Sequence, residues 1–202
     1  VSVIALIDQI QVHRAAGALG GFVSGVSLAD VASSDAHYRR VRDLLVQHEV
    51  LFFRDQEQTP SVFAAFAKTF GDVLGHPAYS TVGEAPDVQI LESTPESPSK
   101  IEVWHSDMTF MQCPPSFTLL QGQIIPEVGG DTLWASATAA YDALSPQMRA
   151  FLTPLKAVND FRHGFRESLA ERGGAERLAP AIAENPPVEH PLIRTHPETG
   201  RK

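Results

Sequence analysis

One histidine and one aspartate stand two positions apart in the segment Trp-His-Ser-Asp at residues 104–107. On an extended chain alternate side chains project from the same face, so His105 and Asp107 could occupy neighbouring corners of one metal's coordination sphere. A further histidine would complete the two-histidine, one-carboxylate facial triad that is typical of non-haem Fe(II) sites with open positions. On the spacing alone, a surface or capping pair is the more frequent explanation.

Several other motifs surround this pair in a fixed order. Residues 104–110 read Trp-His-Ser-Asp-Met-Thr-Phe, and they are followed by Pro114-Pro115 and by Gly-Gly-Asp-Thr-Leu-Trp at 129–134. Further stretches are Phe-Phe-Arg-Asp-Gln at 52–56, Gly-His-Pro-Ala-Tyr at 75–79, Asn-Asp-Phe-Arg at 159–162 and His-Pro-Leu-Ile-Arg-Thr-His-Pro at 190–197. Over nearly the whole chain these motifs resemble the taurine dioxygenase family of Fe(II)- and 2-oxoglutarate-dependent oxygenases.

The resemblance implies a role for each matching position. It implies that His105 and Asp107 are iron ligands and that Thr132 contacts 2-oxoglutarate. It also implies that His76 and Tyr79 contact the sulfonate of the substrate, and that the rings of Phe161 and Phe165 line the pocket. A sulfonate is an anion that requires hydrogen-bond donors, and an imidazole and a phenol in one short loop supply two. Taken alone, His76 could equally be a loop histidine with a structural hydrogen bond, and Thr132 could satisfy the end of a strand.

Two positions depart from the family pattern near the substrate. Ile101 replaces a polar amide before the Trp-His motif, and Gly164 replaces a serine before the second pocket phenylalanine. Both changes remove hydrogen-bonding groups. The resemblance therefore implies recognition of a sulfonate more strongly than recognition of the taurine amine.

The family's third iron ligand, a distal histidine, and its 2-oxoglutarate-binding arginine have no counterpart among the matched motifs. His163, His190 and His196 fall in segments that match non-ligand positions, so we expect them to serve turns and hydrogen bonds. We expect the missing pair beyond Lys202, and we expect residues 1–202 to be a single dioxygenase domain that is incomplete at its C-terminus. If the protein did end at Lys202, a non-catalytic remnant that binds or scaffolds would be the alternative.

The function implied by the resemblance is hydroxylation of taurine or a related sulfonate with Fe(II), 2-oxoglutarate and dioxygen. Sulfite, an aldehyde, succinate and CO2 would be the products. The same chemistry on an alkyl sulfate or a phenoxy acid is the alternative, because relatives share the iron motif and differ in the pocket. The family also implies a homo-oligomer.

The elements that must position these residues can be predicted from local patterns. The sequence predicts helices at 35–48 and 59–70 and a helix starting at Ser145-Pro146 with Met148, Phe151 and Leu152 facing inward. Strands are predicted at 22–26, 50–53, 88–91, 117–123, 132–134 and 188–195. This mixture favours a mainly β fold with flanking helices over a doubly wound parallel sheet, and a dinucleotide or P-loop fingerprint is missing. The resemblance implies a double-stranded β-helix (jelly-roll) core.

Composition sets outer limits on the function. The chain of 202 residues carries 16 Lys and Arg against 24 Asp and Glu, a formal net charge of −8, which argues against a nucleic-acid or anionic-membrane surface. Cys113 is the single cysteine, so an intramolecular disulfide is impossible and a reducing, cytoplasmic location is expected. No apolar run reaches the length of a membrane span.

Overall fold

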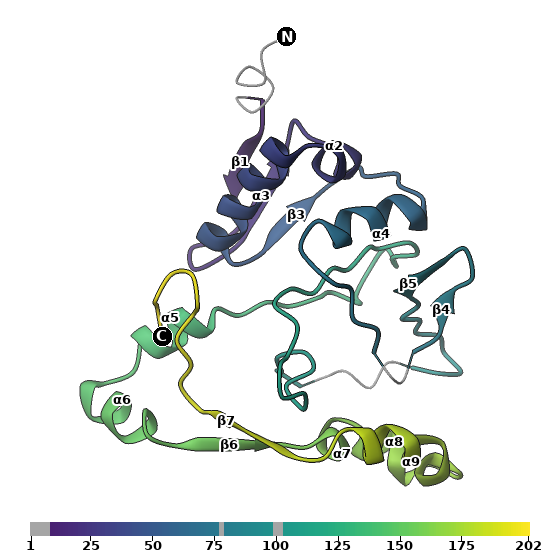
Figure 1. The fold of residues 1–202 in the computed structure, drawn as a ribbon, viewed down its shortest axis with the longest axis vertical. Helices are drawn as coiled ribbons and strands as arrows, with labels where there is room; N and C mark the ends of the chain where they lie inside the picture. Colours follow the sequence, from purple (N-terminus) through teal and green to yellow (C-terminus); the bar gives the residue numbers. More distant parts are fainter. Residues whose placement is uncertain (1–8, 77–78, 99–102) are drawn as a thin grey trace. The chain divides into compact units, whose positions relative to one another are not determined.

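The computed structural model describes residues 9–76, 79–98 and 103–202, and these residues form two compact units. The first unit contains the residues up to Val73 together with Leu119–Arg149 and Arg194–Lys202. The second contains Leu74–Thr118 and Ala150–Ile193. Each unit is therefore built from stretches that are distant in the sequence, as the colours in Figure 1 show.

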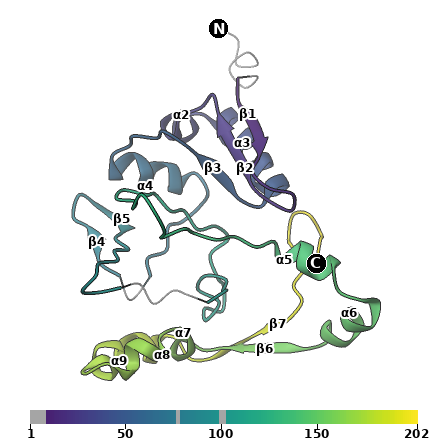
Figure 2. The same cartoon turned by 180° about the vertical axis from the view of Figure 1, so that it is seen from behind.

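A three-stranded sheet and its covering helices form the core of the first unit. Strands β1 (Gln11–Arg14) and β2 (Gly21–Ser24) are antiparallel, and β2 is parallel to β3 (Leu51–Phe53). Helices α2 (Leu28–Ser33) and α3 (Asp35–His48) connect β2 to β3. Helix α3 lies in front of the strands in Figure 1 and behind them in Figure 2, so it covers one face of the sheet. On that face Leu44 packs against Ile10 and Val23.

Local sequence signals account for the helices of this unit. The predicted helix 35–48 is confirmed as α3, whose N-terminus is capped by the Ser34 side chain. The predicted helix 59–70 is confirmed as α4 (Pro60–Lys68), with Thr59 as its cap and proline at the first helical position. Phe66 of α4 packs with Val31 and Val41 in a second buried cluster. Local capping and apolar spacing therefore fix both helices.

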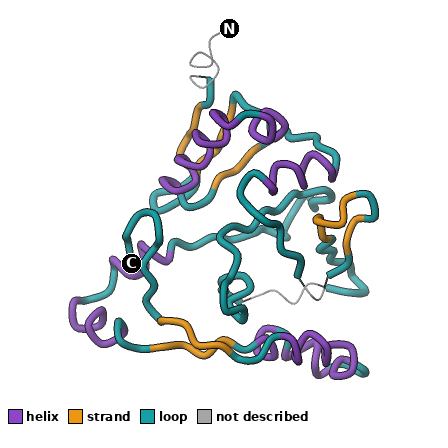
Figure 3. Tube along the Cα trace, viewed as in Figure 1, coloured by secondary structure: helices purple, strands orange, loops and turns teal. Residues whose placement is uncertain are grey.

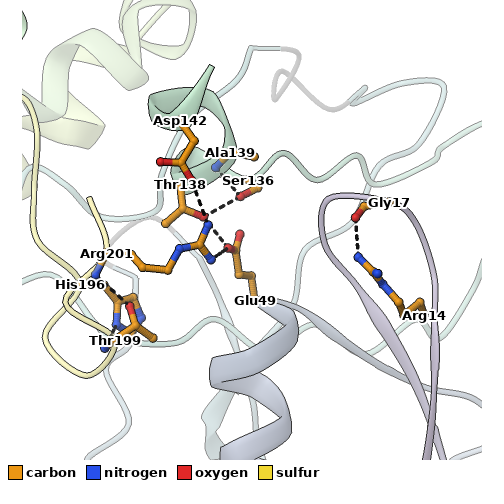
Figure 4. A network of polar contacts seen from close by, with 10 residues as sticks. All are labelled: Arg14, Gly17, Glu49, Ser136, Thr138, Ala139, Asp142, His196, Thr199 and Arg201. Carbon is orange, nitrogen blue, oxygen red and sulfur yellow. Dashed lines mark hydrogen bonds and ion pairs between the residues drawn. The ribbon is translucent and has the colours of Figure 1, made fainter. Parts of the chain in front are cut away.

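The last residues of the chain are bound to this unit by charged side chains. Arg201 pairs with Glu49, just after α3, at 3.3 Å, and with Asp142 of α5 (Ala137–Asp142) at 3.4 Å (Figure 4). Arg42 of α3 also pairs with Glu198. The turn that carries Glu198 and Arg201 is thereby held against α3 and α5.

The second unit combines two small sheets with short helices. Its elements are β4 (Thr81–Val82), β5 (Ala85–Gln89), β6 (Lys156–Asn159), α7 (Phe161–Gly164), α8 (Arg166–Ala170), α9 (Gly174–Glu184) and β7 (Val188–Pro191). Strands β4 and β5 pair antiparallel, as do β6 and β7. A small core forms where Phe161 of α7 packs against Leu178 and Ala181 of α9. This core lies next to the ring cluster described below.

The prediction of a mainly β fold is confirmed only in part. In the described residues more positions are helical than extended, and the strands form three separate sheets. The predicted strands 117–123 and 132–134 are wrong for this structure, since the described residues between β5 and α5 form loops and turns (Figure 3). A strand needs a hydrogen-bonded neighbour, and an apolar run cannot supply one by itself. The predicted strands 22–26, 50–53, 88–91 and 188–195 correspond, in shortened or shifted form, to β2, β3, β5 and β7.

The predicted start of a helix at Ser145-Pro146 is confirmed by α6 (Pro146–Leu152). Its predicted inward face is wrong for Met148 and Phe151, which are 44% and 63% exposed, whereas Leu152 is partly buried. An apolar spacing shows that a helix has an apolar side, but only neighbouring elements decide whether that side is covered. Among the described residues, no helix has the length and apolar character needed to cross a membrane.

Candidate functional site

The structure brings His105 and Asp107 together in a loop of the second unit. Nε2 of His105 lies 3.1 Å from Oδ1 of Asp107, and both side chains are a little under half exposed. Two ligand atoms that each lie about 2.1 Å from one metal ion and subtend a right angle are about 3.0 Å apart. The separation in the structure therefore matches two adjacent ligands of one ion.

The other polar atom of each side chain is held by a neighbour. Nδ1 of His105 lies 2.9 Å from the carbonyl oxygen of Val103, which can only accept, so Nδ1 is the donor in this bond. The Thr118 hydroxyl donates to Oδ2 of Asp107 at 2.7 Å. These bonds leave Nε2 and Oδ1 facing each other, which is the usual way in which outer contacts orient metal-binding side chains.

This donor set fits Fe(II) as two ligands of a facial triad. An imidazole nitrogen and a carboxylate oxygen are the ligand types of such sites. Within the described residues, no group of three His, Cys, Asp or Glu side chains could hold a metal ion together. The role of His105 and Asp107 as ligands stays a prediction, which their donor atoms and spacing fit.

A cluster of aromatic rings, which we call the ring cluster, surrounds His76 in the same unit. Its members are His76, Tyr79, Phe110, Phe161 and Phe165. The His76 ring centroid lies 4.7 Å from that of Tyr79 and 5.3 Å from that of Phe165. Phe161 stacks on Phe165 at 4.4 Å and meets Phe110 edge-on at 5.1 Å. All four residues predicted to contact substrate, His76, Tyr79, Phe161 and Phe165, therefore lie in one cluster.

Burial and the charge of Asp107 set the protonation of the two polar rings. Burial lowers the pKa of His76, and the nearby Asp107 carboxylate partly opposes this effect. Burial also raises the pKa of Tyr79, and Asp107 raises it further. At neutral pH His76 is therefore uncharged with one N–H, and Tyr79 keeps its hydroxyl proton. Phe110 of the ring cluster stands three residues after Asp107, so one short segment contributes to both the His-Asp pair and the ring cluster.

The contacts described above do not include Thr132, or the two positions that depart from the family pattern, Ile101 and Gly164. Thr132 lies in an exposed loop of the first unit, so its contact with 2-oxoglutarate stays a prediction. Ile101 lies outside the described residues, between two parts of the chain that are described. Gly164 ends α7, and a Cβ added there would meet nothing within 4 Å.

The three histidines expected to serve hydrogen bonds differ in their surroundings. His190 of β7 is buried, and its Nε2 lies 2.9 Å from the Thr109 carbonyl and 3.0 Å from the Met111 carbonyl. It thereby secures the backbone on both sides of Phe110. Nδ1 of His196 accepts hydrogen bonds from the backbone N–H of Glu198 and from that of Thr199, the second of which is drawn in Figure 4. His163 is exposed on α7.

Sequence reasoning missed three residues that support the site. Thr118 contacts Asp107 across 11 positions, and Gln89 contacts His76 across 13, so no local spacing marks either of them. The signal for Gln89 was slight, a single amide inside the apolar run Val-Gln-Ile-Leu at 88–91. Phe110 was visible within its motif, but nothing in the sequence showed that its ring would meet Phe161.

Residues 11–202 match the family described as "Taurine catabolism dioxygenase TauD, TfdA family". The chain is 34% identical over 201 residues to an alkylsulfatase of Acinetobacter baylyi, covering 96% of this chain and 62% of that protein. It is 32% identical over 195 residues to an (S)-phenoxypropionate/alpha-ketoglutarate-dioxygenase of Sphingobium herbicidovorans, covering 91% and 65%. A solved taurine dioxygenase from Burkholderia xenovorans superposes with a TM-score of 0.71 at 31% identity, over 96% of this chain and 61% of that one. The chain thus spans less than two thirds of the length of these three proteins. With its motifs, its fold and these matches in agreement, the chain belongs to the taurine catabolism dioxygenase TauD, TfdA family.

Proposed function

We propose that the whole protein is an Fe(II)- and 2-oxoglutarate-dependent dioxygenase that hydroxylates a small organic anion. A sulfonate such as taurine, or an alkyl sulfate, is the proposed substrate. The observation that carries this proposal is the position of Asp107. Its carboxylate lies 3.1 Å from His105, and Phe110 of the ring cluster follows it by three residues in the same unit, which supports one site for the metal-binding pair and the anion donors.

Each side chain of the site has a task that follows from its contacts. His105 and Asp107 would hold Fe(II), which with 2-oxoglutarate supplies the activation of dioxygen that the oxidation requires. His76 and Tyr79 would donate to the oxygens of the substrate anion. Phe110, Phe161 and Phe165 would exclude water and contact the organic part of the substrate. Thr132 would contact the 2-oxoglutarate carboxylate, as its motif implies.

The overall reaction divides the two oxygen atoms of dioxygen. One enters succinate as 2-oxoglutarate loses CO2, and the other becomes a hydroxyl on the carbon next to the sulfonate or sulfate group. The hydroxylated product then breaks down to an aldehyde with release of sulfite from a sulfonate or sulfate from a sulfate ester. The release of sulfite or sulfate therefore reports which class of substrate is used.

An alkyl sulfate is a second candidate, which the ring cluster favours. Three phenylalanine rings and a phenol would suit an apolar chain, whereas the amine of taurine would need a polar or charged partner. The 34% identity with an alkylsulfatase supports the same class. A phenoxy acid is the third substrate class, supported by the phenoxypropionate dioxygenase at 32% identity.

We also propose that the chain is part of one dioxygenase domain with a double-stranded β-helix core. The superposition on a taurine dioxygenase with a TM-score of 0.71 supports this proposal.

Succinate formation by the purified whole protein tests the activity. The protein is incubated with Fe(II), 2-oxoglutarate and air, and with taurine, a medium-chain alkyl sulfate or a phenoxy acid. We expect substrate-dependent succinate with at least one compound and none with the His105→Ala variant, which loses an iron ligand. Substrate-dependent succinate from the variant would refute the ligand assignment, and its absence from the wild type with the whole panel would refute the proposed activity.

A further inference from the structure

The side chain of Gln89 holds both described ends of the loop that carries His76 and Tyr79. Its Oε1 accepts a hydrogen bond from the backbone N–H of His76 at 2.6 Å. Its Nε2 donates to the carbonyl oxygens of His76 at 2.8 Å and of Tyr79 at 3.3 Å. The oxygen of the amide thus accepts one hydrogen bond from the loop, and its nitrogen donates two. Only one orientation of the glutamine amide satisfies all three bonds.

Gln89 itself stands on a paired strand. It is the last residue of β5, where it lies opposite Thr81 of β4, and the pairing continues with a bond from Ile90 N to Ser80 O at 2.9 Å. Its side chain is therefore anchored in a hydrogen-bonded ladder while it binds a loop. A functional side chain is placed most reliably when a regular element supports it in this way.

The contacts of Gln89 separate it from the metal-binding pair. Within the described residues, no hydrogen bond joins Gln89 to His105 or Asp107. Its influence reaches the site only through the backbone of His76 and Tyr79, whose rings are 4.7 Å apart in the ring cluster. Loss of this influence should therefore affect the anion donors and leave the metal ligands in place.

We propose that Gln89 is a positioning residue that sets substrate affinity by fixing His76 and Tyr79 in the ring cluster. This inference rests on the proposed function of that cluster as the anion-binding site. The three hydrogen bonds of one half-buried amide carry it. Gln89 does not touch the substrate in this proposal, and its effect passes through the two rings.

Two variants separate the parts of this role. Gln89→Met keeps the length of the side chain and removes all three hydrogen bonds. Gln89→Glu keeps the acceptor for His76 N–H but sets a carboxylate against two carbonyl oxygens. Gln47→Met is the matched control, because Gln47 is an exposed glutamine on α3. Thermal unfolding of all three variants checks that each is folded at the assay temperature.

For the whole protein, we expect Gln89→Met and Gln89→Glu to raise the KM of the preferred substrate about tenfold or more, since small displacements of binding groups have effects of this size. The affinity for Co(II), used as a metal probe, should stay within twofold of the wild type. A KM unchanged in either variant, or a fall in Co(II) affinity parallel to the rise in KM, would overturn the proposal.

An NMR titration of His76 tests the positioning without any turnover. If Gln89→Met releases the loop, His76 becomes more exposed and its titration midpoint rises toward the ordinary value for histidine of about 6.5. A midpoint equal to that of the wild type would overturn the positioning role. If no substrate is turned over but the midpoint rises, the proposed function fails while the role of Gln89 in placing His76 stands.

Discussion

Replacing Thr118 by valine should weaken metal binding through Asp107. Valine has the shape of threonine, so the change removes the 2.7 Å hydrogen bond from the Thr118 hydroxyl to Oδ2 with little change in volume. Without that bond the carboxylate can rotate about its last side-chain torsion. Oδ1 then no longer stays 3.1 Å from Nε2 of His105, and part of the binding free energy must be used to restore this arrangement.

The size of the effect follows from the bond and its exposure. Loss of an outer contact of this kind typically lowers metal affinity by about 10- to 100-fold. The Asp107 side chain is 44% exposed, so water can replace part of the lost hydrogen bond. We therefore expect the lower end of the range, about tenfold, which corresponds to about 1.4 kcal/mol in binding free energy.

Calorimetric titration of the whole protein with Co(II) at neutral pH measures this difference. Thr118→Ser is the matched control, because serine keeps the hydroxyl and should bind the ion within about twofold of the wild type. Thermal unfolding without metal shows whether either variant is damaged in its fold. The reasoning is refuted if Thr118→Val binds as tightly as the wild type, or if Thr118→Ser binds as weakly as Thr118→Val.

Three further outcomes concern stability. Because burial lowers the pKa of His76, the unfolded chain takes up a proton at this group at higher pH than the folded protein. The free energy of unfolding should therefore fall as the pH drops below about 6.5. Urea unfolding at pH 7.5 and at pH 5.5 measures this fall, which should be smaller in His76→Phe than in the wild type. His190→Leu removes the donor from two part-buried hydrogen bonds, to the carbonyl oxygens of Thr109 and Met111, and should cost about 1 kcal/mol. A variant as stable as the wild type in urea would contradict this. Phe161→Ala should lower the free energy of unfolding by about 3 kcal/mol, since the residue is 1% exposed in a small core. Phe151 is 63% exposed, so Phe151→Ala should change this free energy by less than about 0.5 kcal/mol. Equal losses in the two variants would show that burial is not the cause.

Features that depend on neighbours in the sequence could be predicted, and features that depend on distant partners could not. The limits of α3 follow from an apolar spacing and a serine cap, all within 15 consecutive residues, 34–48. The segment 117–123 has an equally clear strand pattern, but pairing requires another strand at the right distance and none is described there. A helix forms its backbone hydrogen bonds within one segment, so a local pattern can predict it. A strand needs a second strand as its hydrogen-bonding partner, and a local pattern does not show where that partner lies.

The same distinction applies to the site. His105 and Asp107 could be paired from a spacing of two residues, and the family motifs pointed to His76 and Tyr79. Thr118 and Gln89, which hold these residues, contact them across 11 and 13 positions, and no local sequence pattern marks such contacts. The contact between Phe110 and Phe161 of helix α7 could not be predicted either, because it joins residues 51 positions apart. The motifs thus pointed to the candidate site residues, and the structure showed which side chains hold them in place.

The ion pairs of Arg201 and Glu198 bear on the time course of folding during synthesis. Glu49 and its partner Arg201 are separated by 152 residues, and Arg42 and Glu198 by 156. At a ribosomal rate of about 5–20 residues per second, α3 emerges roughly 8–30 s before these partners exist. During that interval the sheet β1–β2–β3 and α3 lack these two ion pairs, and the contacts open to them include the buried residues Leu44 and Val41. If this part folds during synthesis, it therefore does so on apolar burial alone, and the ion pairs of Glu198 and Arg201 are added afterwards.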